Sequence, residues 1–116
     1  MDLSTPPPPS LEALEALLRQ HWGYTHFREA QVPVVSAAAK GQDVLAILPT
    51  GGGKSLCYQV PGLHRSGVCL VISPLVALIA DQVFGLRKAG VVADALIGAM
   101  SPAAMDRTLS RFVHGP

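Results

Sequence analysis

Apolar residues in this 116-residue chain follow two patterns, one typical of buried strands and one typical of helices. The segments 44–48 and 68–72 are apolar throughout, as strands covered on both faces of a sheet usually are. A third strand candidate spans 91–96. Segments with apolar residues three or four positions apart predict helices. The expected helices cover 11–20, 32–40, 54–60, 74–88 and 102–112.

Residues that start or stop helices flank these segments. Ser10 and Ser101 are suited to cap the first and last helices, because a serine hydroxyl accepts a hydrogen bond from an early helical N–H. Ser73 is expected to cap the fourth helix, with Pro74 at its first position. Pro61, which a glycine follows, is expected to end the third helix.

The alternation of strands and helices predicts an α/β fold with a doubly wound, mostly parallel sheet and flanking helices. Ligands of such sheets bind at the carboxyl ends of the strands. The glycine-rich segment after Leu48 and the turn at Ser73 both follow strand candidates. We therefore expect both on the same edge of the sheet.

The glycine-rich segment is typical of a phosphate-binding loop, since successive glycines let backbone N–H groups approach an anion and the following helix directs its N-terminus at the same point. The residues assigned to the phosphates are Thr50, Gly51, Gly52, Gly53, Lys54 and Ser55. Lys54 is the expected catalytic cation, and Ser55 the expected Mg²⁺ ligand. Leu48 stands where the general pattern has glycine, but several nucleotide-driven motors begin this loop without one. The alternative is a glycine-rich surface turn.

Aromatic and amide side chains concentrate in 21–31, just before the second predicted helix. Tyr24 could stack on a base, and Gln31 could read an adenine edge, because its amide offers both a donor and an acceptor. The alternative places Trp22 and Phe27 in the core and Gln31 on a solvated helix face. Composition alone favours this second interpretation.

Net charge limits the expected partners. At +1, the chain has no broad basic surface for nucleic acid, so any contact with DNA must be local. Cys57 and Cys69 lie in apolar surroundings and are expected in the core, while the four histidines lack the spacing of metal ligands. No apolar stretch is long enough to cross a membrane and no signal peptide is recognisable, which favours the cytoplasm. Residues 1–9, with four consecutive prolines, are expected to be a disordered leader, although such a run could also bind an aromatic groove.

Three blocks together resemble the RecQ family of DNA helicases, within helicase superfamily 2. The first holds Trp22, Tyr24, Arg28 and Gln31, the second is the glycine loop continued to Pro61, and the third spans 71–83. The resemblance implies a RecA-like domain that binds ATP with Mg²⁺ and couples ATP hydrolysis to separation of DNA strands in the 3′-to-5′ direction. It also implies that Tyr24, Arg28 and Gln31 hold the base end of the nucleotide. Ser73, Pro74 and Leu75 would contact single-stranded DNA.

Some family features differ or are missing. Glu29 and Ala30 replace the usual Pro-Gly pair, and Pro33 stands where the family has ordinary helix formers. The acidic Asp-Glu-x-His element that would activate the attacking water does not occur, and Ala95 follows Asp94 where its glutamate would be. We therefore interpret Asp94 as structural. Residues 10–116 are expected to be a truncated amino-terminal part of the domain, inactive alone, with an exposed strand edge.

Two other functions fit less of the sequence. A non-catalytic module that only senses ATP, or an inert fragment, would explain the missing acidic element. A small P-loop kinase would need a glycine at Leu48 and an arginine-rich lid, neither of which occurs.

Overall fold

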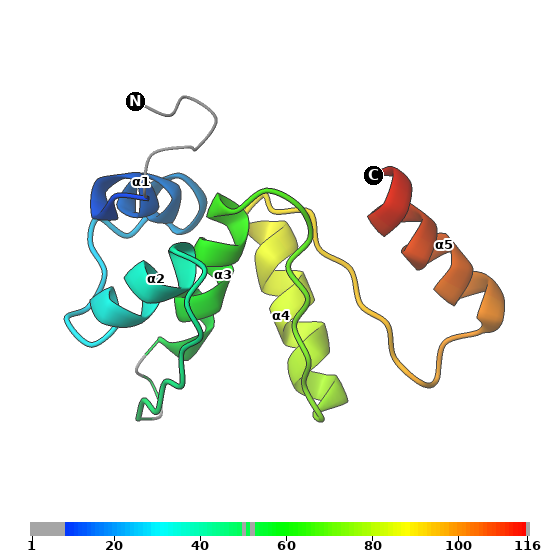
Figure 1. Ribbon diagram of the computed structural model, residues 1–116. Helices are drawn as coiled ribbons and strands as arrows, with labels where there is room; N and C mark the ends of the chain where they lie inside the picture. The colour runs from blue at the N-terminus through cyan, green and yellow to red at the C-terminus, as the bar shows by residue number, and fades with distance from the viewer. Residues whose placement is uncertain (1–8, 50, 52, 116) are drawn as a thin grey trace. The chain divides into compact units, whose positions relative to one another are not determined.

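A computed structural model describes residues 9–49, 51 and 53–115, which divide into two compact units, Met1–Cys69 and Leu70–Pro116. The described residues of the first unit form helices α1, Leu11–Trp22, α2, Val32–Ala39, and α3, Lys54–His64 (Figure 1). Those of the second form α4, Val76–Lys88, and α5, Pro102–His114. Most of the expected leader lies outside the described residues.

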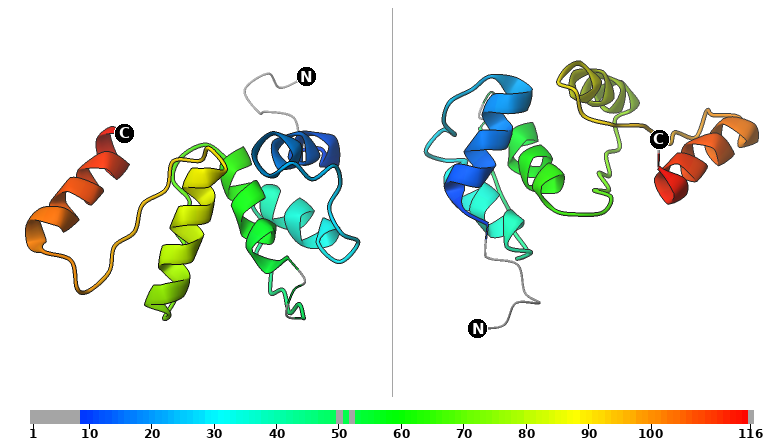
Figure 2. Two further views of the ribbon diagram at one scale, coloured as in Figure 1. Left: turned by 180° about the vertical axis from the view of Figure 1, so that it is seen from behind. Right: turned by 90° about the horizontal axis from the view of Figure 1, so that it is seen from above.

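Helices α1, α2 and α3 pack on one another around one small core, and α3 contacts both of the others (Figures 1 and 2). The buried apolar residues of this core are Leu14, Leu18, Phe27, Val35, Ala39, Cys57 and Val60. Cys57 is therefore in the core as predicted, whereas Cys69 is exposed, contrary to the prediction.

The predicted limits of α1 are nearly correct. The Ser10 hydroxyl accepts a hydrogen bond from the Ala13 N–H at 3.1 Å, and Gly23 ends the helix at a φ of 79°. Leu14 and Leu18, one turn apart, are fully buried against the other two helices. The helix is two residues longer than the predicted range 11–20, because it continues to Trp22 and ends where Gly23 adopts a positive φ.

The prediction that Pro61 ends α3 is wrong. The helix runs through Pro61 to His64, and the Arg65 N–H donates to the Pro61 carbonyl at 3.1 Å. Proline removes one helical hydrogen bond and crowds the preceding turn. Here Pro61 is buried beside Val60, so tertiary packing offsets this local cost.

The predicted parallel sheet is also wrong for the part of the chain that the structure describes, because none of its residues forms a strand. Segments 44–48, 68–72 and 91–96 are neither helical nor paired. Most of their apolar side chains are exposed, with Leu45 89% exposed and Ile72 86% exposed, although Leu48 packs against the core of the first unit. A strand exists only where a neighbouring segment completes its hydrogen-bond ladder, and β-rich composition does not supply that neighbour.

In the second unit, α4 begins later than predicted. The Ser73 hydroxyl accepts from the Leu75 N–H at 3.3 Å, so it closes a short turn and does not cap the helix, whose N-cap is Leu75. The last helix begins as predicted, with the Ser101 hydroxyl accepting from the Ala104 N–H at 3.2 Å. No residue of α4 is buried among those described.

Asp94 links three parts of the second unit. It accepts from Arg111 Nε at 2.8 Å and from Arg87 at 3.3 Å, and it also accepts from the Ala95 N–H. Burial acts to raise the pKa of Asp94, but the hydrogen bond from Arg111 and the charges of both arginines outweigh it and hold the pKa below its usual value. These contacts agree with a structural role for Asp94.

Asp94→Asn should therefore loosen the second unit, lowering its free energy of unfolding by about 1 kcal/mol, since partly exposed ion pairs contribute little individually. Because the folded-state pKa is depressed, the stabilisation is present above the unfolded pKa of about 3.9 and is lost as pH falls through the folded value. Amide hydrogen exchange along 91–114 measures the effect. Asp81→Asn, at an exposed position of α4, is the control. Equal exchange rates in the two variants would contradict this prediction.

Candidate functional site

Two described residues of the glycine loop adopt backbone conformations that favour glycine. Gly51 and Gly53 have φ values of 80° and 76°, in the left-handed region that glycine adopts without strain. Gly53 is the N-cap of α3, which begins at Lys54 as predicted. Thr50 and Gly52 lie outside the described residues.

Two side chains from the segment before α2 hold this loop. The buried Gln31, 2% exposed, donates through Nε2 to the Gly53 carbonyl at 3.0 Å. Arg28 donates through its guanidinium to the Gly51 carbonyl. The Gln31 Oε1 atom accepts from the backbone N–H of Arg28 at 2.8 Å, so one amide joins both segments.

The Gln31 contact orients the first peptide of α3. The described chain has no cis peptide bond, and in a trans peptide the C=O and N–H groups point in opposite directions. Because the Gly53 carbonyl faces Gln31, the Lys54 N–H faces away from it. The N-cap of α3 makes no side-chain hydrogen bond, and the first N–H groups of a helix have no partner within it. This N-terminus therefore offers donors and a positive dipole end to an anion.

The chemical groups at the start of α3 fit a nucleotide phosphate. Lys54 is exposed at the first helical position and Ser55 is half-buried at the second. Burial raises the pKa of the Cys57 thiol, so the group stays protonated and donates weakly to the Gly53 carbonyl at 3.7 Å. The Gly53 carbonyl thus accepts from the Cys57 thiol of α3 as well as from Gln31.

The aromatic segment divides between core and surface. Phe27 is buried and Trp22 packs against the core, as one interpretation predicted, whereas Tyr24 is 59% exposed. That interpretation was wrong for Gln31, because the residue is buried and not solvated. The sequence offered no signal for its partner, since the Gly53 carbonyl lies 22 residues away.

Gln31→Leu should destabilise the first unit by about 1–3 kcal/mol, because at nearly constant side-chain volume it removes the amide donor to the Gly53 carbonyl and the acceptor of the Arg28 N–H. The denaturant midpoint of the chain measures this loss. Gln42→Leu, at an exposed position after α2, is the matched control and should shift the midpoint little. Equal midpoints for the two variants would show that the amide does not support the loop.

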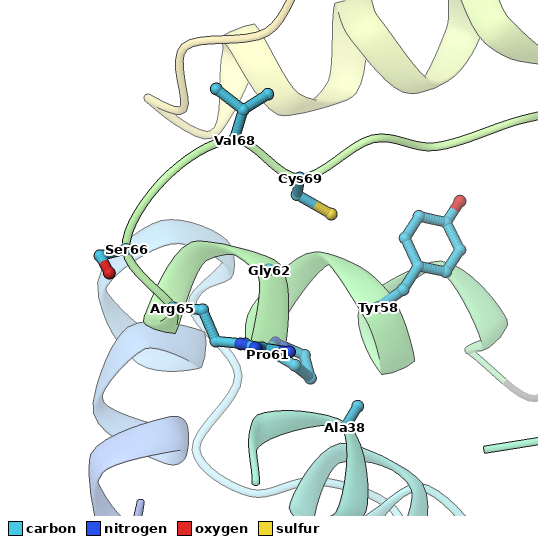
Figure 3. Close-up of a pocket in the computed structure, with 8 residues that line it drawn as sticks. All are labelled: Ala38, Tyr58, Pro61, Gly62, Arg65, Ser66, Val68 and Cys69. Atoms are coloured by element: carbon cyan, nitrogen blue, oxygen red, sulfur yellow. The ribbon is translucent and has the colours of Figure 1, made fainter. Parts of the chain in front are cut away.

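Two hollows of the first unit border α3. One, of about 390 Å³, is lined by Ala38 and by residues of α3 and the segment after it, and Figure 3 shows Cys69 turned toward the helix there. A Cβ at Gly62 would lie 2.7 Å from the Cys69 sulfur, so a larger residue there would require the Cys69 side chain to move. None of the predicted nucleotide residues lines this hollow. The second, of about 400 Å³, includes Lys54.

The residues predicted to contact DNA belong to the second unit. Pro74 and Leu75 are exposed, and Ser73 is half-buried with its hydroxyl occupied by the Leu75 N–H. This arrangement leaves the hydroxyl hydrogen available as a donor.

A sequence profile of the DEAD/DEAH box helicases matches residues 28–114, which is most of the chain. The chain belongs to the DEAD/DEAH box helicase family. The match includes Arg28, Gln31, the whole glycine loop and the Ser73 turn, whereas Tyr24 precedes it. The family assignment thus covers nearly every predicted site residue.

Individual members of the helicase family are also similar to the chain. It is 48% identical over 90 residues to an ATP-dependent DNA helicase RecQ of Synechocystis sp., covering 78% of this chain and 19% of that protein. It is 41% identical over 100 residues to the RecQ helicase of Haemophilus influenzae, and that match covers 86% of this chain and 16% of the helicase. An ATP-dependent DNA helicase Q-like 2 of Arabidopsis thaliana is 49% identical over 72 residues, and that match covers 62% of this chain and 10% of the plant protein. The resemblance to RecQ helicases is confirmed, and the chain spans less than a fifth of the length of these relatives.

The described residues hold neither a membrane-spanning helix nor a cluster of metal-ligating side chains. None of the helices there has the length and apolar character needed to cross a membrane. No group of three or more His, Cys, Asp or Glu side chains in that part of the chain could hold a metal ion.

Proposed function

We infer that the chain is the nucleotide-binding, amino-terminal part of a RecQ-like, ATP-dependent DNA helicase that separates strands in the 3′-to-5′ direction. The observation that supports this most is the pair of contacts from Arg28 and Gln31 to the loop carbonyls of Gly51 and Gly53. They join the block that resembles a base-recognition motif to the block that resembles a phosphate loop. A chance glycine-rich turn would not require that junction.

The roles of the site residues follow from their chemistry. Lys54 would bind the β- and γ-phosphates, and the backbone from Thr50 to Gly53 would surround them. Ser55 would hold Mg²⁺, which when bound neutralises charge on the phosphate oxygens. At the other end, Tyr24 would stack on adenine. Gln31, whose buried amide is bonded to the loop, would hold the base end of the nucleotide together with Arg28.

The DNA contacts are proposed for the turn before α4. Backbone N–H groups there, with the Ser73 hydroxyl, suit the phosphate of a single strand, and Pro74 and Leu75 would lie beside it. DNA as substrate would place the protein in the cytoplasm, at the nucleoid. Residues 10–116 would act as one partial ATP-binding domain after a leader at 1–9.

A nucleotide-sensing module without hydrolysis is the second candidate. It is favoured by Asp94, whose carboxylate is held by Arg87 and Arg111 and is therefore not free to hold Mg²⁺ or to activate a water. The chain alone would then bind ATP but not cleave it.

Two measurements test the proposal. Titration of the chain with Mg-ATP should show binding, and its absence would overturn the nucleotide site. Single-turnover hydrolysis by the full-length gene product should accelerate when single-stranded DNA is added. A rate of ATP hydrolysis that single-stranded DNA does not change would contradict the helicase proposal. ATP binding without any hydrolysis would favour the nucleotide-sensing module.

A further inference from the structure

We propose that Glu15 and Arg19 of α1 are positioning residues that fix the loop carrying Tyr24, and thereby determine how strongly the chain prefers an adenine nucleotide to bare polyphosphate. This inference rests on the proposed function, in which Tyr24 contacts the base. It assigns a role to α1, which lies outside the residues matched by the family profile.

Two contacts connect α1 to the loop. A Glu15 carboxylate oxygen lies 3.0 Å from His26 Nδ1, and since a carboxylate only accepts, the imidazole nitrogen donates. Arg19 donates through its guanidinium to the Thr25 carbonyl at 3.3 Å. Glu15 and Arg19 are four positions apart, so they lie on one face of the helix.

These contacts are placed where they restrain Tyr24. On one side of it, the Gly23 N–H donates to the Leu18 and Arg19 carbonyls at 3.1 Å and ends the helix. On the other side, Thr25 and His26 are bound by the two α1 side chains, and Phe27 is buried in the core. Tyr24 is therefore an exposed aromatic residue between fixed neighbours, which suits a surface that must be ready for a planar ligand.

The contacts fit positioning better than stability. The His26 side chain is 75% exposed, although that of Glu15 is only 13% exposed, and partly exposed ion pairs contribute little to folding. The helix itself is anchored through Leu14 and Leu18, so its polar face can be altered without disturbing the core. Ordering a loop before the ligand arrives lowers the cost of binding.

The test compares two ligands on the full 116-residue chain, Mg-ATP and Mg-tripolyphosphate, by isothermal titration. The double variant Glu15→Ala/Arg19→Ala should raise the dissociation constant for Mg-ATP by about three- to tenfold, the range expected for re-ordering a loop and its side chains. Its dissociation constant for tripolyphosphate should stay unchanged. The single variant Glu15→Gln keeps an oxygen that can accept from His26, so its dissociation constant for Mg-ATP should stay close to that of the unaltered chain.

Controls separate the outcomes. Gln20→Ala, at the adjacent exposed position of α1, should leave both constants unchanged. Arg19→Ala alone keeps the test valid if the double variant unfolds, because it truncates only an exposed side chain. Equal loss for both ligands, or no loss, would overturn the inference and leave the phosphate site standing. If the unaltered chain binds neither ligand, both the proposed function and this inference fail.

Discussion

Lys54→Ala should lower the affinity of the chain for Mg-ATP by about tenfold to 100-fold. The side chain is exposed at the first position of α3, beside N–H groups that have no partner within the helix. A hydrogen bond between an ammonium and a phosphate contributes about 1.5–3 kcal/mol, which corresponds to this range. Isothermal titration with Mg-ATP measures it directly.

The control for Lys54 is another exposed lysine. Lys40→Ala changes the C-cap of α2 and removes the same charge, so a general electrostatic effect would appear in both variants. Lys54→Arg should recover part of the affinity, since the charge is kept while the geometry changes. If Lys54→Ala binds Mg-ATP as tightly as Lys40→Ala does, the glycine loop is not the phosphate site.

The features predicted correctly from sequence are those that depend on near neighbours. Ser10 and Ser101 bond N–H groups three residues ahead, and their helices begin where the sequence predicts. The start of α3 at Lys54 is equally local, because glycine at positive φ before a helical segment marks the boundary. Ser73 shows the limit of such reasoning, since a hydroxyl can close a turn instead of capping a helix.

The features that sequence could not predict depend on distant partners. The apolar segments 44–48 and 68–72 have strand composition, but no described residue pairs with them. Pro61 continues a helix because its ring is buried, which the local rule does not include. Gln31 entered the candidate site only through a family resemblance, and its buried contact with Gly53 required coordinates.

Gly53→Ala should have the largest effect on stability, lowering the free energy of unfolding by about 2–3 kcal/mol. The φ of 76° alone costs an alanine about 1 kcal/mol. An added Cβ would also overlap Nε2 of Gln31, and this amide is buried and cannot swing into solvent. Displacing it breaks the hydrogen bond to the Gly53 carbonyl and leaves buried polar groups unpaired. Denaturant unfolding of the chain measures the loss.

Two comparisons separate the loss of stability caused by the positive φ from the loss caused by the overlap with Gln31. Gly23→Ala has nearly the same φ, 79°, and its Cβ would meet no atom within 4 Å, so it should lose only about 1 kcal/mol. The double variant Gly53→Ala/Gln31→Ala should lose less free energy of unfolding than the two single variants lose together. Truncating Gln31 removes the side chain with which the added Cβ would overlap. Equal losses for Gly53→Ala and Gly23→Ala would show that Gln31 does not press on the loop.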